Sequence, residues 1–207
     1  MMRLLKPLLA PAARAALRVR YSPGEIASLL DDAFADYRRQ LPSLPPERQA
    51  GARLMVHFAA LTAGVYRELR VRDVSESDAR RLTADMSWRV YEKMATVPWV
   101  VARGTRATPF GRLERATRVS RTFPFTAPSY EMVDVPADEG VVAFDVRRCP
   151  VAEYFHAQGL SELCVEAWCN LDIPLARRWG GRLERSGTLA QGAERCDFRW
   201  HVDEERR

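Results

Sequence analysis

The stretch GVVAFDVRRCPVAEYFHAQG (residues 140–159) changes its hydrophobic pattern partway through. Its first half, up to Cys149, is an apolar run rich in valine, which is typical of a β-strand. Pro150 then stands near the start of a helical pattern of about three turns, and Gly159 supplies the glycine that commonly follows a helix C-terminus. The stretch therefore predicts a strand that runs directly into a short helix, with a thiol at the junction.

Further strand patterns lie on both sides of this stretch. YEMVDVP (130–136) predicts a strand before it, and residues 182–189 and 195–202 predict a hairpin after it. Between them, residues 160–179 predict one or two helical pieces, interrupted at Pro174. Because strands and helices do not alternate regularly, the pattern favours an antiparallel sheet over a parallel one.

Helical patterns fill the N-terminal half. SPGE (22–25) combines a capping box with proline at the first helical position, and it starts a helix that reaches about residue 41. A second helix is predicted over residues 47–72, and a third from Ser75 until Pro98 ends it. The residues from 101 to 129 are predicted to be a connector rich in glycine, proline and arginine, with some strand content.

These patterns predict an α+β fold, with a helical N-terminal half and a C-terminal half of mostly antiparallel sheet with two or three short helices. The 207 residues are enough for one sizeable core. We expect a helical region over residues 22–112 and an α+β region over residues 113–207, packed together as one compact unit.

The first 21 residues are predicted to form a basic arm that accounts for the whole net charge of +5. It contains Arg3, Lys6, Arg14, Arg18 and Arg20 and no acidic residue. Because a DNA-binding domain usually spreads its basic residues over a folded face, we expect no nucleic-acid partner. Apolar residues at a rough helical spacing, interrupted at Pro7 and Pro11, predict an arm that packs on the body. Contact with a membrane surface is the weaker alternative.

Localisation and redox state follow from two further patterns. No segment approaches a transmembrane span, and no uninterrupted apolar run resembles a secretory signal, so we expect a cytoplasmic protein. All four cysteines lie beyond residue 148, at positions 149, 164, 169 and 196. A disulfide scaffold would be smaller and denser in cysteine, so we expect reduced thiols that serve catalysis, metal binding or packing.

Cys149 is the first candidate for chemistry. It stands at a predicted helix N-terminus, where unpaired N–H groups and the helix dipole favour a thiolate. Arg147 and Arg148 add positive charge beside it. The alternative is a small buried hydrophobic residue at the end of a strand, which taken alone is the more frequent role of a free cysteine.

Three more residues extend this candidate site. Cys169 and Asp172 are three residues apart on a predicted helix and share a face, so the acid could exchange a proton with the thiol. Cys196 lies on the apolar face of its strand, whereas Cys164 should point away from Cys169 and is expected to be structural. Each residue alone fits a core position, but with Cys149 the set could converge on one site.

Zinc is the alternative use of the same residues. Three thiolates and a carboxylate, from Cys149, Cys169, Cys196 and Asp172, could bind it. The spacings are not those of a standard zinc finger and there is no CxxC motif, so we predict no cofactor and keep zinc as the weaker possibility.

The three histidines are dispersed along the chain. His57 lies beside the apolar face of its helix and is expected to be a core residue. His156 lies two turns after Cys149, which is far for a general base, and His201 faces away from Cys196. No Cys–His pair is therefore secure.

The C-terminal motifs resemble the L-2-amino-thiazoline-4-carboxylic acid hydrolase family. The resemblance covers about residues 141–200. It rests on Arg148-Cys149-Pro150, on Cys169-x-x-Asp172, on Arg185, Thr188, Leu189 and Gly192, and on Cys196-Asp197-Phe198. The N-terminal half resembles the family only in its helical character.

The resemblance implies a bacterial hydrolase that opens a small cyclic amidine or isothiourea ring, at a carbon–nitrogen or carbon–sulfur bond, to give a carbamoyl cysteine. It suggests Cys149 or Cys196 as nucleophile and Asp172 as acid or base, and Arg148 or Arg185 as the group that holds a substrate carboxylate. The partner would be a small-molecule substrate.

The last hairpin is also similar to small-molecule-sensing 4-vinyl-reductase-type domains, which use cysteines near this position for a metal. This similarity supports a second hypothesis, a non-enzymatic module that binds a small molecule or a metal. Fold alone does not decide between the two.

Overall fold

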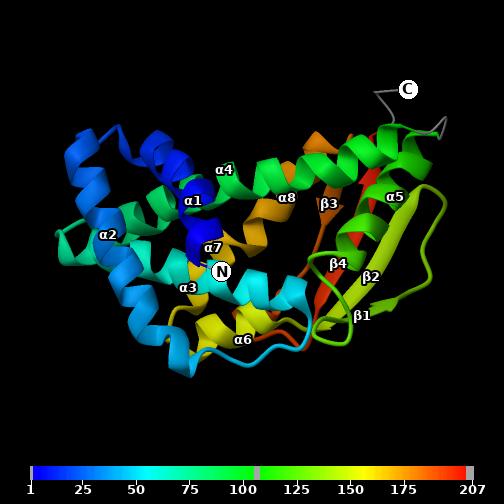
Figure 1. The fold of residues 1–207 in the computed structure, drawn as a ribbon. Helices are drawn as coiled ribbons and strands as arrows, with labels where there is room; N and C mark the ends of the chain where they lie inside the picture. The colour runs from blue at the N-terminus through cyan, green and yellow to red at the C-terminus, as the bar shows by residue number, and fades with distance from the viewer. Residues whose placement is uncertain (1, 105–107, 204–207) are drawn as a thin grey trace.

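The computed structural model describes residues 2–104 and 108–203, and it arranges them as a helical layer beside an antiparallel sheet (Figure 1). The helices are α1 (Met2–Leu17), α2 (Pro23–Gln40), η1 (Leu41–Ser43), α3 (Ala50–Val71), α4 (Glu76–Arg103), α5 (Pro109–Thr122), α6 (Pro150–Ala157), α7 (Ser161–Ala167), η2 (Cys169–Leu171), α8 (Asp172–Arg178) and η3 (Leu189–Gln191). The strands are β1 (Glu131–Asp134), β2 (Val141–Arg148), β3 (Gly181–Glu184) and β4 (Cys196–Val202). The predicted α+β class is confirmed.

The sheet has the strand order β1-β2-β4-β3, and its strand pairs are antiparallel. Strands β2 and β4 form its centre, and their register pairs Phe144 with Phe198 and Val146 with Cys196. Side chains on one face of a strand alternate with a period of two, so these four residues face the same side of the sheet. That face packs on α5, on α8 and on the C-terminal part of α4.

The protein has two hydrophobic cores, one among the helices and one between the sheet and the helices that cover it. Helix α4 contributes to both. Its N-terminal part buries Leu82 and Met86 among the helices, and its C-terminal part buries Ala95 beside the sheet. The prediction that Pro98 ends this helix is wrong, because the helix continues to Arg103 with Pro98 inside it. Pro98 is itself buried, and packing against α5 offsets the hydrogen bond that a proline cannot make.

Residues 2–17 also form a helix that continues through both of its prolines, so Pro7 and Pro11 do not interrupt it as predicted. Its apolar face is covered by α4 and α2. The buried side chains on this face are Leu5, Leu9, Ala12, Ala13, Ala16 and Leu17. None of the helices in residues 2–104 and 108–203 combines the length and apolar content that a membrane span requires.

Two further predictions need correction. The expected connector, of which residues 105–107 lie outside the described residues, contains helix α5, capped by Thr108 and buried through Leu113 and Ala116. The many arginines of α5 conceal its amphipathic pattern in the sequence.

The expected break at Pro174 occurs earlier, at Trp168. Pro174 lies in the first turn of α8, where a backbone N–H would have no helical partner, so the proline costs no hydrogen bond.

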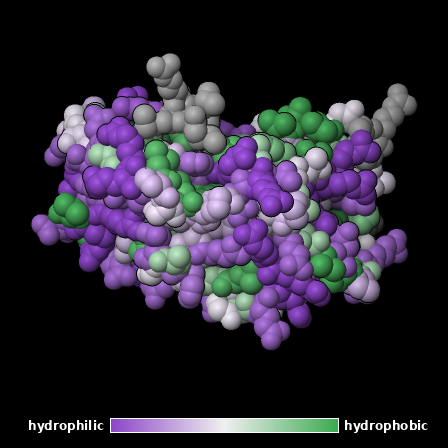
Figure 2. All heavy atoms as spheres, turned by 60° about the horizontal axis from the view of Figure 1, so that its bottom comes forward, coloured by the Kyte–Doolittle hydropathy of each residue, from purple (hydrophilic) through white to green (hydrophobic). Residues whose placement is uncertain are grey.

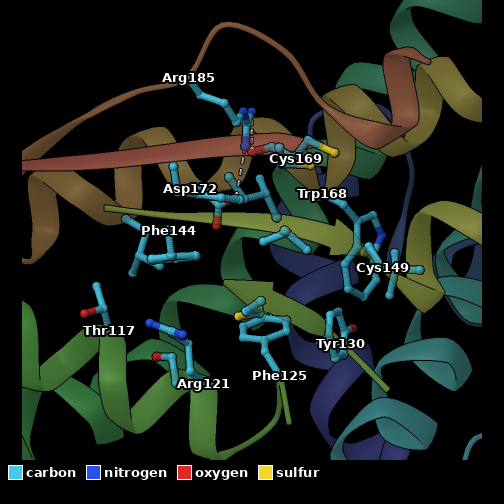
Figure 3. Close-up of a pocket in the computed structure, with 18 of the residues that line it drawn as sticks. Thr117, Arg121, Phe125, Tyr130, Phe144, Cys149, Trp168, Cys169, Asp172 and Arg185 are labelled. Atoms are coloured by element: carbon cyan, nitrogen blue, oxygen red, sulfur yellow. Dashed lines mark hydrogen bonds and ion pairs between the residues drawn. The ribbon is translucent and has the colours of Figure 1, made fainter. Parts of the chain in front are cut away.

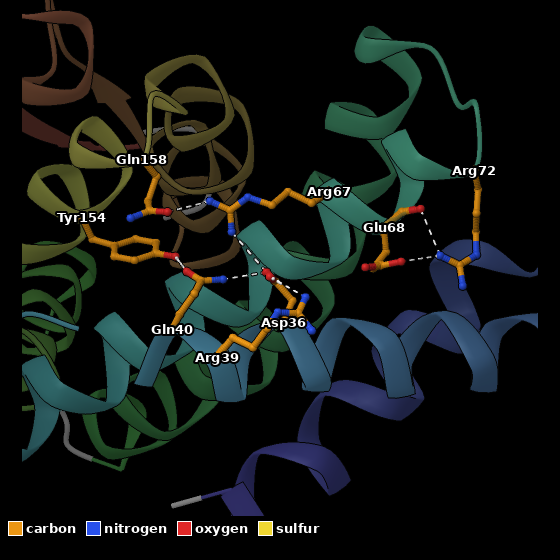
Figure 4. Close-up of polar contacts among 8 residues, drawn as sticks. All are labelled: Asp36, Arg39, Gln40, Arg67, Glu68, Arg72, Tyr154 and Gln158. Carbon is orange, nitrogen blue, oxygen red and sulfur yellow. Dashed lines mark hydrogen bonds and ion pairs between the residues drawn. The ribbon is translucent and has the colours of Figure 1, made fainter. Parts of the chain in front are cut away.

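Polar contacts fix α6 on the helical layer (Figure 4). Arg67 of α3 bonds Asp36 of α2 at 3.2 Å and the side chain of Gln158, just after α6, at 2.7 Å. The hydroxyl of Tyr154 donates to Gln40 at 2.6 Å. Because Cys149 is the N-cap residue of α6, these contacts also fix the position of its thiol.

The molecular surface has no dominant apolar region on the face that Figure 2 presents. Hydrophilic side chains cover most of that face, and hydrophobic ones form small separate groups between them. Most buried apolar residues of the described chain belong to two cores, one among the helices and one beside the sheet.

Gly51 allows the segment after α5 to lie directly on α3. A Cβ atom at this position would lie 2.3 Å from the carbonyl oxygen of Pro124, whereas a Cβ atom on Gly24 would meet nothing within 4 Å. We expect Gly51→Ala to lower the free energy of unfolding by roughly 1–3 kcal/mol, because backbone must move. The control Gly24→Ala should leave it unchanged or slightly higher. Equal denaturant midpoints for the two variants would contradict this packing.

Candidate active site

A cavity of about 130 Å³ lies between the apolar face of the sheet and the helices α4, α5 and α7 (Figure 3). Such a volume holds roughly four water molecules, or a small ring compound of similar size. Its aromatic lining residues are Tyr91, Phe125, Tyr130, Phe144, Trp168, Trp179, Phe198 and Trp200. All four cysteines, Asp172 and Arg185 also line it.

Chain reversals bring the cysteines together. Cys149 follows β2, and Cys196 begins β4 directly opposite Val146 of β2. Cys169 and Asp172 lie at the tight turn between α7 and α8, where η2 redirects the chain. The structure therefore places Cys149, Cys169, Asp172 and Cys196 around one cavity.

Asp172 is the charged group at the centre of the site. The hydroxyl of Tyr91 donates to its Oδ1 at 2.9 Å, and Nη1 of Arg185 donates to its Oδ2 at 3.3 Å. Its side chain is 16% exposed and that of Arg185 only 8%. Burial raises the pKa of Asp172 to about 6, although Arg185 and Tyr91 both act to lower it. The carboxyl group can therefore take up or release a proton near neutral pH.

Cys169 is the thiol whose surroundings favour the thiolate. A hydrogen bond from Cys164 lowers its pKa most, and the positive charge of Arg185 and a hydrogen bond from Thr188 add to this effect against the cost of burial. Nη2 of Arg185 also donates to the Cys169 carbonyl oxygen at 3.1 Å. Among the four cavity cysteines, this is the one whose pKa lies below its usual value.

The prediction that Cys164 points away from Cys169 is wrong. Five residues on one straight helix would face different directions, but α7 ends at Ala167 and the chain turns at Trp168. The turn returns Cys169 to Cys164, and their side chains are hydrogen-bonded. As the donor of this bond, Cys164 has a pKa well above its usual value.

The other two thiols are held neutral. Burial is the largest cause that raises the pKa of Cys149 to about 12 and that of Cys196 to about 11. The sulfur of Cys196 accepts a hydrogen bond from the Leu189 N–H at 3.2 Å. The expectation that the N-terminus of α6 favours a Cys149 thiolate is therefore corrected, because burial outweighs the short helix's dipole.

Arg148 does not line the cavity. Its guanidinium bonds the carboxylates of Glu47 at 2.8 Å and Glu153 at 2.9 Å, and it donates to the Ser129 carbonyl at 2.6 Å. Arg148 thus joins β2 to the loop before α3 and to α6. The cation that contacts the candidate site is Arg185 instead.

The histidines lie outside the cavity. Nδ1 of His57 is 2.6 Å from the Tyr37 hydroxyl, and burial lowers its pKa, as suits a core histidine. His156 is exposed on α6. His201 pairs with Glu184 at 2.9 Å. None of them contacts Cys149 or Cys169.

Tyr91 and Arg121 are two of the lining residues that the sequence patterns did not identify. Tyr91 lies one position after Val90, a buried residue of α4, so a helical projection could have placed it near the core. Arg121 lies in the segment that was read as a connector. Its guanidinium is 4.7 Å above the Phe144 ring and pairs with Asp134. No local pattern marks Arg121, because its position depends on how α5 packs on the sheet.

The four residues named for the zinc alternative line this cavity. Within residues 2–104 and 108–203, no three His, Cys, Asp or Glu side chains are arranged so that they could hold a metal ion.

The effect of the Tyr91 hydrogen bond on the pKa of Asp172 can be tested. Because this hydrogen bond favours the charged carboxylate, Tyr91→Phe should raise the pKa of Asp172 above about 6, by roughly one unit. Tyr154→Phe removes a hydroxyl that bonds Gln40 instead and should leave that pKa unchanged. Carboxyl carbon NMR titration measures both. A lowered or unaltered pKa in Tyr91→Phe would contradict the assignment.

Comparison with known proteins adds an independent observation. Residues 100–200 match the family model of L-2-amino-thiazoline-4-carboxylic acid hydrolase. The searches of curated proteins and of solved structures gave no match. The matched range contains every cysteine, Asp172 and Arg185, whereas the similarity to 4-vinyl-reductase-type domains is not supported by it. Through residues 100–200, the chain is therefore similar to the L-2-amino-thiazoline-4-carboxylic acid hydrolase family.

Proposed function

We propose that this protein hydrolyses a cyclic amidine or isothiourea ring of the 2-amino-thiazoline-4-carboxylate type, with Cys169 as nucleophile and Asp172 as proton carrier. The observation that carries the proposal is the pairing of a thiol of lowered pKa with a carboxyl of pKa about 6 on the wall of one apolar cavity. The match of residues 100–200 to the family model supports a hydrolase.

The first step forms a covalent bond. The Cys169 sulfur adds to the ring carbon that lies between nitrogen and sulfur, and the electron pair of the C=N bond moves to nitrogen, which takes a proton from Asp172. A ring bond from that carbon then breaks, and its electron pair stays on the departing heteroatom. The ring is now open and its carbon is attached to Cys169.

The second step consumes water. Water adds to the same carbon and gives one proton to Asp172, and the bond to the Cys169 sulfur then breaks, so that the thiolate returns. The remaining hydroxyl proton passes to the departed heteroatom as the carbonyl group forms. The sum is one water molecule added to one ring. Either ring bond satisfies this balance: cleavage of carbon–sulfur releases a thiol, and cleavage of carbon–nitrogen releases an amine.

This cycle starts with one proton shared by Asp172 and Cys169, because the thiolate attacks while the carboxyl group gives its proton to the ring nitrogen. Asp172 with its pKa near 6 and Cys169 with a lowered pKa can share it close to neutral pH. Cys149 and Cys196, the nucleophiles that the family resemblance suggested, stay protonated there, which makes them weaker nucleophiles. We assign them to the cavity wall.

The lining also suits a flat ring. Phe144 and Phe198 stack at 5.1 Å between ring centroids, and Trp200 is nearly parallel to Phe198. Such faces bind planar heterocycles and exclude water from the reaction. Arg185 is already bonded to Asp172 and to the Cys169 carbonyl, so we assign it the positioning of these two groups rather than the binding of a substrate carboxylate.

A cysteine series tests the proposal. Cys169→Ala should lower kcat/KM for ring opening of 2-amino-thiazoline-4-carboxylate about 1,000-fold or more, because the nucleophile is lost. Cys149→Ala and Cys196→Ala remove wall thiols of similar burial and should keep activity within about tenfold. Product analysis by mass spectrometry measures the rates and identifies the broken bond.

Two results would contradict the assignment. Full activity in Cys169→Ala would remove the proposed nucleophile. Binding of the ring by the wild-type protein without turnover would favour the second hypothesis, a non-enzymatic small-molecule module, which the enclosed aromatic lining also suits.

A further inference from the structure

The hydroxyl of Tyr130 is a polar group of the cysteine cavity that the proposed chemistry does not use. Tyr130 lies just before β1, is 3% exposed and lines the cavity beside Phe125, with 5.3 Å between the two ring centroids. Figure 3 shows both rings on the side of the cavity opposite Asp172 and Arg185. In the part of the chain that the structure describes, residues 2–104 and 108–203, this hydroxyl has no hydrogen-bond partner.

The groups around Tyr130 explain why its hydroxyl is a donor without an acceptor. The nearby carboxylate of Glu47 accepts a hydrogen bond from Arg148 at 2.8 Å instead. Burial raises the pKa of Tyr130 well above its ordinary value, and the thiols of Cys149 and Cys164 add to this effect, so the phenol keeps its proton. A buried donor without a partner costs free energy of folding. Such a group on the wall of a cavity is therefore a candidate to bind an acceptor of the ligand.

Two further buried donors line the same cavity. The indole Nε1 atoms of Trp168 and Trp200 have no hydrogen-bond partner among the described residues. An indole N–H can only donate a hydrogen bond, and a protonated phenol such as that of Tyr130 donates readily. The described polar atoms that the cavity leaves buried without a partner can therefore all act as donors. Such a lining suits a ligand that presents acceptors, and above all an anion.

Arg121 supplies positive charge that is not balanced inside the cavity. Arg121 and Arg185 are the two cationic residues that line it in the described part of the chain. Arg185 is paired with Asp172 within the cavity, whereas Arg121 is paired with Asp134, whose side chain is 75% exposed and lies outside the cavity. An ion pair with so exposed a partner is weak, so the Arg121 guanidinium keeps charge and N–H donors for a bound anion.

The substrate class of the proposed function carries one such anion, the carboxylate on its ring. We infer that the hydroxyl of Tyr130 donates a hydrogen bond to this carboxylate, and that Tyr130 thereby distinguishes the ring acid from the same ring without a carboxyl group. This inference rests on the proposed function and adds a specificity-determining residue to it. A hydrogen bond to a charged oxygen is stronger than one between neutral groups, and stronger still where water is excluded. Tyr130 takes no part in bond cleavage.

Removal of the hydroxyl alone tests the inference. Cys169→Ala lacks the proposed nucleophile and serves as the background, so calorimetry measures binding without turnover. The two probes are 2-amino-thiazoline-4-carboxylate and 2-amino-thiazoline, which is the same ring without the carboxyl group. In this background, Tyr130→Phe should weaken binding of the acid about tenfold or more and that of 2-amino-thiazoline by less than about twofold.

In the protein that retains Cys169, the same substitution separates binding from chemistry. Tyr130→Phe should raise KM for the acid about tenfold or more and change kcat by less than about threefold, because the carboxylate contact is the same in the ground state and the transition state. Tyr154→Phe is the matched control. Its hydroxyl bonds Gln40 at 2.6 Å and its side chain does not line the cavity. This control should change KM and affinity by less than about twofold.

A structural role of the hydroxyl would give a different result. Because the Tyr130 hydroxyl has no described partner in the protein, Tyr130→Phe should unfold at the wild-type denaturant midpoint or a higher one. Tyr154→Phe loses its bond to Gln40 and should unfold at a lower midpoint. If the midpoint of Tyr130→Phe falls as far as that of Tyr154→Phe, the hydroxyl stabilises the fold and the inference is overturned.

The binding and kinetic outcomes separate this inference from the proposed function. If Tyr130→Phe weakens both probes equally, or leaves affinity and KM for the acid unchanged, Tyr130 does not bind the carboxylate and the hydrolase function stands. If the acid loses affinity selectively but the wild-type protein does not open the ring, the carboxylate contact stands and the proposed ring-opening function fails. If Cys169→Ala does not bind the acid and the wild-type protein does not open it, both proposals are overturned.

Discussion

The guanidinium of Arg185 is the contact on which the candidate site depends. It bonds the carboxylate of Asp172 and the backbone carbonyl of Cys169, and it is almost completely buried. One cation thus holds the acid and the turn that carries the thiol in a fixed relation. Without it, Asp172 would be a buried charge without a cationic partner, which is strongly destabilising.

Burial and local contacts act in opposite directions on the four thiols. Burial raises the pKa of every cysteine in the cavity, and only Cys169 has enough hydrogen-bond donors and positive charge nearby to reverse this effect. The turn at Trp168 is essential here, because it brings Cys164 and Cys169 together. A continuous helix through residues 161–178 would separate them and would leave Cys169 like the others.

Much of the fold could be predicted from local patterns. The capping box at Ser22 and the strand-to-helix junction at Cys149 lie where their residues predicted, because both depend on neighbours in the sequence. The helix through Pro98 and the helix α5 could not be predicted, since tertiary packing there outweighs local propensity. The same limit applies to the site: its cysteines could be named, but not the contact that selects Cys169.

Cys169, and not Cys149 or Cys196, should be the thiol of this protein that ionises first, because its surroundings lower its pKa. The ultraviolet absorbance of thiolates can be followed against pH in the folded wild-type protein and in Cys169→Ser. The cysteine titration with the lowest midpoint should be present in wild type and absent from Cys169→Ser. If that titration persists in Cys169→Ser and disappears in Cys149→Ser or Cys196→Ser instead, Cys169 is not the thiolate.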